Sequence, residues 1–123
     1  MGISYQIVDG IVFTNIEATF SVDDVRAYLV AAVADPSYRA GMPSLVDCRQ
    51  VTALLSPAEL RIIAAEIASI TTAPVAGRCA VLAASDVVFG LVRMYEAYSE
   101  GAPVDVCAFR DHDAAMAWLR TGS

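Results

Sequence analysis

The chain has 123 residues, of which 57% are hydrophobic, and its eight basic residues against fourteen acidic ones give a net charge of −6. This length fits a single domain spanning residues 1–123. Because the negative charge repels phosphate backbones and apolar runs such as 29–34 are too short to cross a bilayer, we expect neither nucleic acid binding nor membrane insertion.

The first segments form a hairpin and then a helix. Residues 3–7 alternate between apolar and polar side chains, Asp9-Gly10 is the residue pair of a type I′ turn, and residues 11–16 continue as a strand. Ser21 is the expected N-cap of the first helix, because two aspartates follow it and favour the positive end of the helix dipole. This helix should stop before Asp35-Pro36.

The next unit is a strand followed by a helix with a well-marked start. Residues 44–49 form a short, buried-looking strand. The second helix begins after Ser56, because Pro57 suits the first helical position, where no N–H donor is needed. Ser56 and Glu59 have the spacing of a capping box. This is a βα step, and ligands of open parallel sheets bind where strands end and helices begin.

After a break over residues 73–77, the alternation of strand and helix continues to the end of the chain. The remaining elements are a strand over 79–83, a helix from Ser85 or Asp86 to about Gly101, a strand over 104–109 and a helix after Asp111. The order ββαβαβαβα predicts an α/β fold with four helices and a five-stranded mixed sheet. Right-handed crossovers make this sheet mostly parallel, with the first strand antiparallel to the second.

Several polar residues are predicted to lie at strand ends, where a ligand or a protein partner would bind. They are Asp47, Arg49, Ser85 and Arg93. Arg93 has two interpretations. It forms a solvated pair with Glu96 at i, i+3, or it points to the strand ends and anchors an anionic group.

The sequence favours a binding protein over an enzyme. It has no Gly-x-Ser-x-Gly elbow and no phosphate-cradling glycine loop, and its single histidine, His112, opens the last helix. Cys48, Cys79 and Cys107 fall on or beside predicted strands without Cys-x-x-Cys spacing, so we expect buried thiols and neither a metal nor a cofactor. No secretory signal is visible at the N-terminus, which predicts a cytoplasmic location.

The third helix is apolar on more than one side. Val87 and Leu91 belong to one stripe, whereas Val88, Phe89 and Val92 form a second patch around the helix. A symmetric homodimer that buries the second patch against its own copy is the simplest candidate, and coverage by a neighbouring helix is an equal alternative. The apolar surplus of the whole chain also favours a homodimer.

The order of elements and three segments resemble a known family over nearly the whole chain. The segments are Leu45-Val46-Asp47, Arg93-Met94-Tyr95 and residues 109–119, and they resemble the SpoIIAA-like group of small bacterial domains of STAS/SEC14 type. This resemblance implies a non-enzymatic regulatory or binding module.

Anti-sigma-factor antagonists of the STAS class carry a phosphorylatable Ser or Thr at the start of the helix that corresponds to the second helix here. The resemblance therefore implies that Ser56 is a phospho-acceptor or a partner-docking residue. The chain departs from the class pattern at Leu55, where Asp is usual, and at Pro57, where a small residue is usual. From the residues alone, Ser56 is a helix N-cap.

Two functions follow as expectations. In the first, a STAS-like regulator docks on a protein partner through a flat surface around the second helix, without a deep pocket. In the second, which resembles the SEC14 side of the family, the domain binds a small apolar or lipid-like ligand in an enclosed cavity of several hundred Å³ between sheet and helices. The first is preferred because the chain is short for a full lipid-transfer fold.

Overall fold

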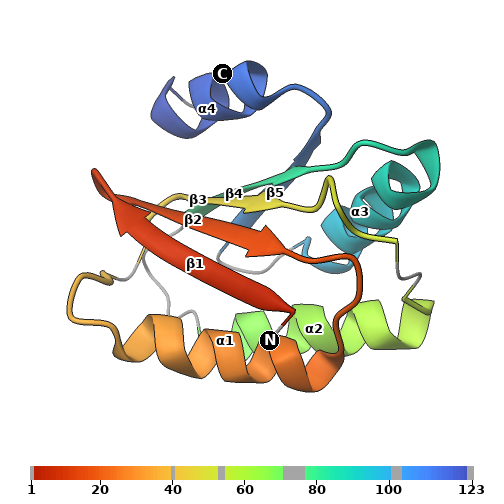
Figure 1. Ribbon diagram of the computed structural model, residues 1–123, viewed down its shortest axis with the longest axis horizontal. Coiled ribbons are helices and arrows are strands. Elements are labelled where there is room, and N and C mark those ends of the chain that lie inside the picture. The colour runs from red at the N-terminus through yellow and green to blue at the C-terminus, as the bar shows by residue number, and fades with distance from the viewer. Residues whose placement is uncertain (1, 40, 53–54, 71–76, 101–103, 122–123) are drawn as a thin grey trace.

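The computed structural model describes residues 2–39, 41–52, 55–70, 77–100 and 104–121, and it confirms the predicted order ββαβαβαβα (Figure 1). The strands are β1 (Ile3–Val8), β2 (Ile11–Ile16), β3 (Ser44–Asp47), β4 (Gly77–Leu82) and β5 (Val104–Phe109). The helices are α1 (Val22–Ala34), α2 (Pro57–Ile70), α3 (Asp86–Tyr98) and α4 (His112–Thr121). Residues 73–76 of the predicted break, and Gly101, lie outside the described residues.

The five strands form one sheet in the order β1-β2-β3-β4-β5, as expected for a mixed and mostly parallel sheet. β1 is antiparallel to β2, and each later strand is parallel to the one before it. Figure 1 shows α1 and α2 beneath the sheet and α4 above it. α3 packs against α2 and β5, so α1, α2 and α3 form one layer and α4 alone forms the other.

The hairpin and the helix starts follow the predicted local chemistry. Asp9 and Gly10 have positive φ angles of 52° and 78°, as a type I′ turn requires at both central positions. At the start of α1, the Ser21 hydroxyl accepts a hydrogen bond from the Asp24 backbone N–H, and the Asp24 carboxylate accepts one from the Ser21 N–H. The Ser85 hydroxyl likewise caps α3. These caps fix where each helix begins, and with it where each loop leaves the sheet.

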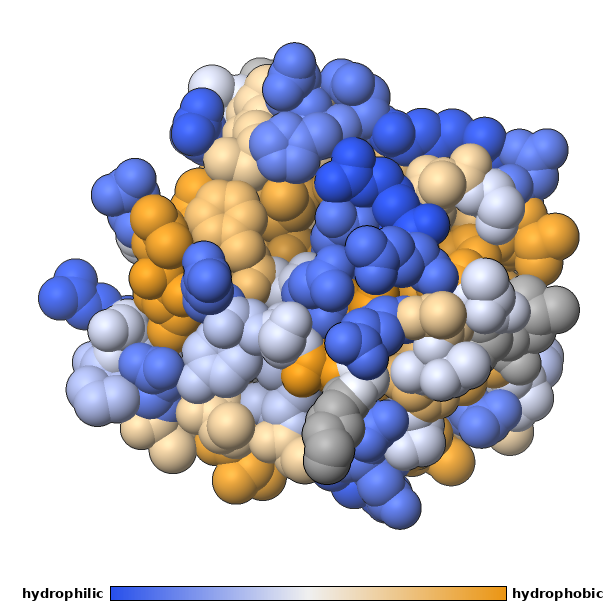
Figure 2. All heavy atoms as spheres, in the orientation of Figure 1, coloured by the Kyte–Doolittle hydropathy of each residue, from blue (hydrophilic) through white to orange (hydrophobic). Residues whose placement is uncertain are grey.

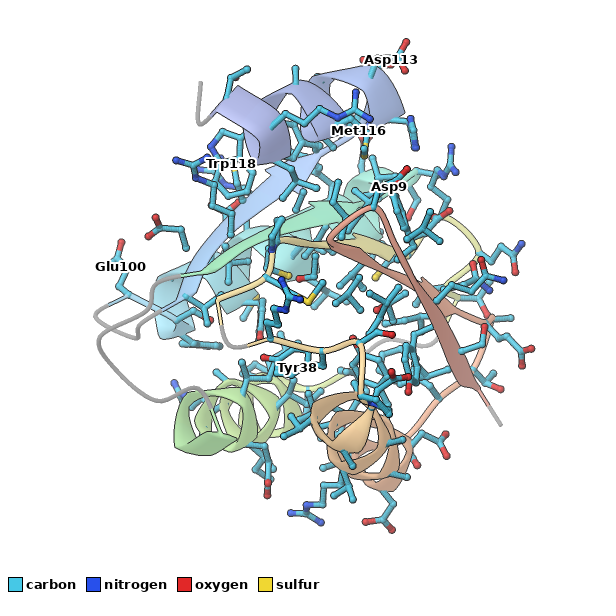
Figure 3. All side chains as sticks on the ribbon, turned by 90° about the vertical axis from the view of Figure 1, so that its left-hand side faces the viewer. Asp9, Tyr38, Glu100, Asp113, Met116 and Trp118 are labelled. Atoms are coloured by element: carbon cyan, nitrogen blue, oxygen red, sulfur yellow. The ribbon has the colours of Figure 1, made fainter. Side chains whose placement is uncertain are left out.

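Two apolar clusters lie on opposite faces of the sheet. On the α4 side, buried residues of the central strands such as Leu45 and Leu82 pack against Ala115 and Leu119 of α4. Figure 3 shows Met116 on the side of α4 toward the sheet and Asp113 pointing away from it. On the other side, the buried residues are Ile16, Cys48, Val81, Ala83, Val88 and Val92. β4 contributes to both clusters, which confirms that it is covered on both faces.

The single helix α4 packs on β3, β4 and β5. The polar residues Ser4 and Gln6 of β1, together with Val8, point to this side of the sheet and are exposed. The α4 face of the β1–β2 hairpin is therefore open, and the residues at the ends of β2 and β3 line the boundary between the open and the covered part. Among the described residues, no helix is both long and apolar enough to cross a membrane.

Candidate functional site

A polar hollow of about 330 Å³ lies on the open part of the sheet, beside the start of α4. Its floor includes Phe13 and Asn15 of β2, and its wall is formed by Asp47, Arg49 and His112. Figure 2 shows hydrophilic residues gathered below α4 on this face of the molecule. Asp47 and Arg49 come together here at the strand ends, where the sequence placed them.

Asp47 and Arg49 form a two-pronged ion pair. The Arg49 Nε donates to Asp47 Oδ1 at 3.0 Å, and Nη2 donates to Oδ2 at 2.8 Å. The Arg49 backbone N–H also donates to Oδ1 at 3.0 Å. These hydrogen bonds, aided by the charge of Arg49, lower the pKa of Asp47 below its ordinary value of 3.8, while partial burial opposes the shift.

The ion pair limits the proton chemistry of the hollow. Asp47 is held ionised, so it is a poor proton donor at neutral pH, and one edge of the Arg49 guanidinium is already occupied by a carboxylate. Within the described part of the chain, the side chains of Gln6 and Asn15 make no hydrogen bond and are available to a polar molecule. His112 Nδ1 lies 3.5 Å from the carboxylate of Asp113, on its own helix.

Ser85 and Arg93, the other predicted strand-end residues, do not line this hollow. Ser85 is exposed, and its hydroxyl accepts a hydrogen bond from the Val88 backbone N–H as the N-cap of α3. Arg93 is exposed, and its Nε lies 3.7 Å from Glu96 Oε1. The Glu96 carboxylate also accepts a hydrogen bond from the Ala108 N–H of β5. Arg93 is thus in the solvated i, i+3 pair that was one of its two interpretations.

Ser56 lies exposed at the start of α2 and forms the predicted capping box. Its hydroxyl accepts a hydrogen bond from the Glu59 N–H at 3.2 Å, and its own N–H donates to Glu59 Oε1 at 3.0 Å. Ser56 is not among the residues that line the polar hollow. Its role as an N-cap is confirmed, and its role as a phospho-acceptor or docking residue stays a prediction.

The apolar patch predicted for the third helix is in the interior of the molecule. Val88 and Val92 are 6% and 7% exposed, and both belong to the core between the sheet and the helices. Phe89 is partly buried against the same cluster, and the Arg110 guanidinium covers its ring at 4.5 Å. The assignment of Val88 and Val92 to an exposed dimer interface is therefore wrong, because α3 turns this side toward the sheet. Val87, on the other stripe, is 58% exposed.

A second, apolar site lies between the sheet and helices α1–α3. It is a cavity of about 140 Å³ whose lining comes from all three helices and from strands β1 to β4. Val25, Leu29, Ile63, Leu91 and Val92 are among its helical walls. A neighbouring space of about 120 Å³ shares several of these walls and continues toward Ser44 and Gly77, where the parallel strands begin.

The cavity wall contains a hydrogen-bonded pair of hydroxyls that joins β2 to α1. Thr14 of β2, which is 3% exposed, lies 2.7 Å from the Tyr28 hydroxyl of α1. Burial raises the pKa of Tyr28 to about 12. Burial also raises the pKa of Cys48 to about 12 and raises that of Cys79, so both thiols in this wall are neutral near pH 7. The wall of the cavity is therefore mostly apolar, with the hydroxyl pair of Thr14 and Tyr28 and with Tyr95, whose hydroxyl is paired with Ser99.

Sequence reasoning located Asp47 and Arg49 but missed Phe13, Asn15 and Gln6 as parts of the hollow. The signal for them was the alternation of residues 3–7, in which the polar residues Ser4 and Gln6 share one face of the strand. Among the described residues, no group of three or more His, Cys, Asp or Glu side chains is placed to hold a metal ion.

No protein-family model matches the chain, and no curated protein is significantly similar to it. The geometry of the two sites is therefore the basis for a functional proposal.

Proposed function

We propose that this protein is a non-enzymatic binding domain whose ligand is a small apolar molecule, held between the sheet and helices α1–α3. The observation that carries the proposal is the cavity of about 140 Å³ with almost entirely apolar walls. Protein interiors are packed so closely that few spaces exceed the size of a water molecule. A space this large in a core of 123 residues is best explained by an occupant.

The volume limits the size of that occupant. An engineered apolar cavity of about 150 Å³ in another protein stays dry and binds benzene or xenon. The cavity here is of the same size, so it suits one ring or a short branched chain and not a complete lipid tail. The sequence led us to expect an enclosed cavity of several hundred Å³, and the cavity between sheet and helices is smaller than that. The ligand proposed here is therefore a single small apolar group and not a whole lipid.

The energetics favour binding over an empty cavity. Unfilled space in a sealed core costs about 24 cal/mol per Å³, so about 3 kcal/mol is the upper bound of the loss for this partly open cavity. A ligand that fills it restores part of that loss and binds only the folded chain. The ligand therefore raises the apparent free energy of unfolding, and the increase grows with the logarithm of the ratio of ligand concentration to dissociation constant.

The test is thermal unfolding with and without saturating benzene. We expect benzene to raise the melting temperature by a few degrees, because about 1 kcal/mol of added stability corresponds to roughly 3–5 °C in a domain of this size. Val92→Phe places a ring in the cavity and should abolish the benzene effect. Val87→Phe is the matched control, since it makes the same change at an exposed position of the same helix.

Overpacking by Val92→Phe could itself prevent folding, so Leu91→Phe is the second cavity-filling variant. The proposal is refuted if benzene changes neither the melting temperature nor the nuclear magnetic resonance shifts of methyl groups at Val25, Leu29 and Ile63. It is also refuted if the benzene effect survives in both cavity-filling variants.

Docking on a protein partner under control of Ser56 is the second candidate function. The exposure of Ser56 at the start of α2 favours it, because the hydroxyl is open to a kinase. A phosphoryl group there would gain from the positive end of the helix dipole but would face the Glu59 carboxylate of the capping box. Phosphosite mapping in the source cell tests this candidate, and Ser56 unmodified under every growth condition would remove it.

The remaining expectations belong to the same proposal. A regulatory role in a bacterial cytoplasm accords with the resemblance to SpoIIAA-like domains, and it would couple ligand binding to a protein partner. The expected homodimer stays a proposal as well, but its surface must lie elsewhere than at the buried residues Val88 and Val92 of α3.

A further inference from the structure

The two edges of the sheet differ in how they are protected. At β5, the Ala108 N–H donates to the Glu96 carboxylate, and Arg93 stands beside that carboxylate. At β1, the opposite edge, the six residues Ile3–Val8 carry no charge and no proline and stay in continuous register with β2. Charges, prolines and bulges are the usual means by which proteins keep an edge strand from pairing with another chain. β1 has none of them.

The turn of the hairpin fixes which backbone groups of β1 are free. Val8 and Ile11 flank the two-residue turn, so they form a hydrogen-bonded pair of the ladder. The bond from the Glu17 N–H to the Gly2 carbonyl, at 2.8 Å, continues the same alternation. The backbone N–H and C=O groups of the even-numbered residues of β1 therefore point toward β2. The N–H and C=O groups of Ile3, Tyr5 and Ile7 point outward, and within the described residues no partner for them is found.

The outward face of β1 is complementary to itself. A twofold axis through Tyr5 would pair Tyr5 with Tyr5 of a second copy, Ile3 with Ile7, and Ser4 with Gln6. Every pair is chemically matched: two apolar pairs, two polar pairs that can hydrogen-bond, and one aromatic pair. In this register all three outward residues form hydrogen-bonded pairs, which gives six backbone hydrogen bonds across the axis.

We infer that the protein forms a homodimer by antiparallel pairing of β1 with β1 of a second copy, which joins the two sheets into one of ten strands. The palindromic order Ile-Ser-Tyr-Gln-Ile favours a second copy over an unrelated strand, because an isologous interface must be complementary to itself. Figure 1 shows β1 along the margin of the sheet above α1. Since each chain carries a net charge of −6, pairing through an uncharged strand also avoids the local repulsion of like charges.

The test measures the mass of the full chain by light scattering and sedimentation over a range of concentrations, with charges exchanged at Ser4 and Gln6. Both residues are exposed on the open face of the sheet, so these substitutions leave the core intact. In the proposed register Ser4 faces Gln6 of the other copy twice. The variant S4E/Q6E therefore opposes like charges at two places and should weaken the dimer about tenfold, whereas S4K/Q6E opposes unlike charges and should strengthen it.

The control is A58E/I62E, which adds the same two negative charges on an exposed side of α2 and should leave the dimer unchanged. Hydrogen exchange gives an independent measurement: the amides of Tyr5 and Ile7 should become protected as the concentration rises, whereas Gln6 and Val8 are protected in the monomer already. A monomer at every concentration up to the millimolar range overturns the inference. A dimer that responds equally to S4E/Q6E, S4K/Q6E and A58E/I62E overturns it too, because its interface would then lie elsewhere.

Discussion

The hydroxyl pair in the cavity wall allows the interior to be tested without any ligand. Thr14 is 3% exposed, and its hydroxyl lies 2.7 Å from that of Tyr28. Thr14→Val keeps the shape of the side chain but leaves the Tyr28 hydroxyl facing apolar walls without a partner. A buried polar group left unpaired costs about 1–3 kcal/mol, so we expect that loss in the free energy of unfolding. Tyr28→Phe leaves Thr14 unpaired and should have a similar effect.

The double variant T14V/Y28F removes both groups and should be less destabilised than the sum of the two single variants. The expected coupling is about 1–2 kcal/mol, measured by urea unfolding with the fluorescence of the single tryptophan, Trp118. Thr19→Val is the control, because Thr19 is exposed. Additive effects within about 0.5 kcal/mol would refute the reasoning. They would mean that each hydroxyl reaches water when its partner is removed, so that the cavity is wet and the proposal of an apolar ligand loses its support.

Three further predictions concern charge and capping. Asp47→Asn should lower the free energy of unfolding by at most about 1 kcal/mol at pH 7, because the ion pair with Arg49 is partly exposed. In acid titrations, the difference in unfolding free energy between the variant and the wild type should vanish as pH falls through the lowered pKa of Asp47. A difference that persists at pH 2 would contradict this. Ser56→Ala should lower the free energy of unfolding, measured in urea, by about 1 kcal/mol through loss of the capping box, whereas Ser56→Gly should lower it by only about a few tenths of a kcal/mol. Equal losses of stability in the two variants would argue against capping. The free energy of unfolding should fall as pH rises above about 10, because Tyr28 ionises in the unfolded chain at its ordinary pKa of 10.0 but in the folded chain only near pH 12. Tyr28→Phe should flatten this decline. If the unfolding free energy of Tyr28→Phe fell with pH as steeply as that of the wild type, the burial assigned to Tyr28 would be contradicted.

The parts of the fold that depend on neighbouring residues could be predicted from the sequence. The Asp9-Gly10 turn, the Ser21 cap and the capping box at Ser56 each follow from chemistry within four residues, and the structure confirms all of them. The strand-end pair of Asp47 and Arg49 was found for a similar reason, since the end of a buried strand is visible in the sequence. Local patterns therefore located the elements and part of the hollow.

The parts that depend on distant contacts could not be predicted in this way. The third helix is apolar on two sides, so its sequence alone does not say which side faces the core. Its orientation is set by its packing against β5, which includes the hydrogen bond from the Ala108 N–H to Glu96. As a result Val88 and Val92 are buried and Val87 is exposed. The cavity is the difference between the space enclosed by the elements and the volume of the side chains that fill it. The hydrophobic periodicity of the sequence does not predict this unfilled volume.

The two candidate sites share one wall, the strand β2, and this makes their roles separable. Successive residues of a strand point to opposite faces, so Phe13 and Asn15 face the polar hollow while Thr14 and Ile16 face the apolar cavity. A substitution at Asn15 can change the hollow without touching the cavity wall. Thr14 borders both spaces, but its hydroxyl is paired with Tyr28 on the cavity side, so Thr14→Val alters the cavity wall. If binding of an apolar molecule depended on Asn15 rather than on Thr14, the ligand would lie on the open face of the sheet. Adjacent residues on β2 can thus assign a ligand to one site or the other.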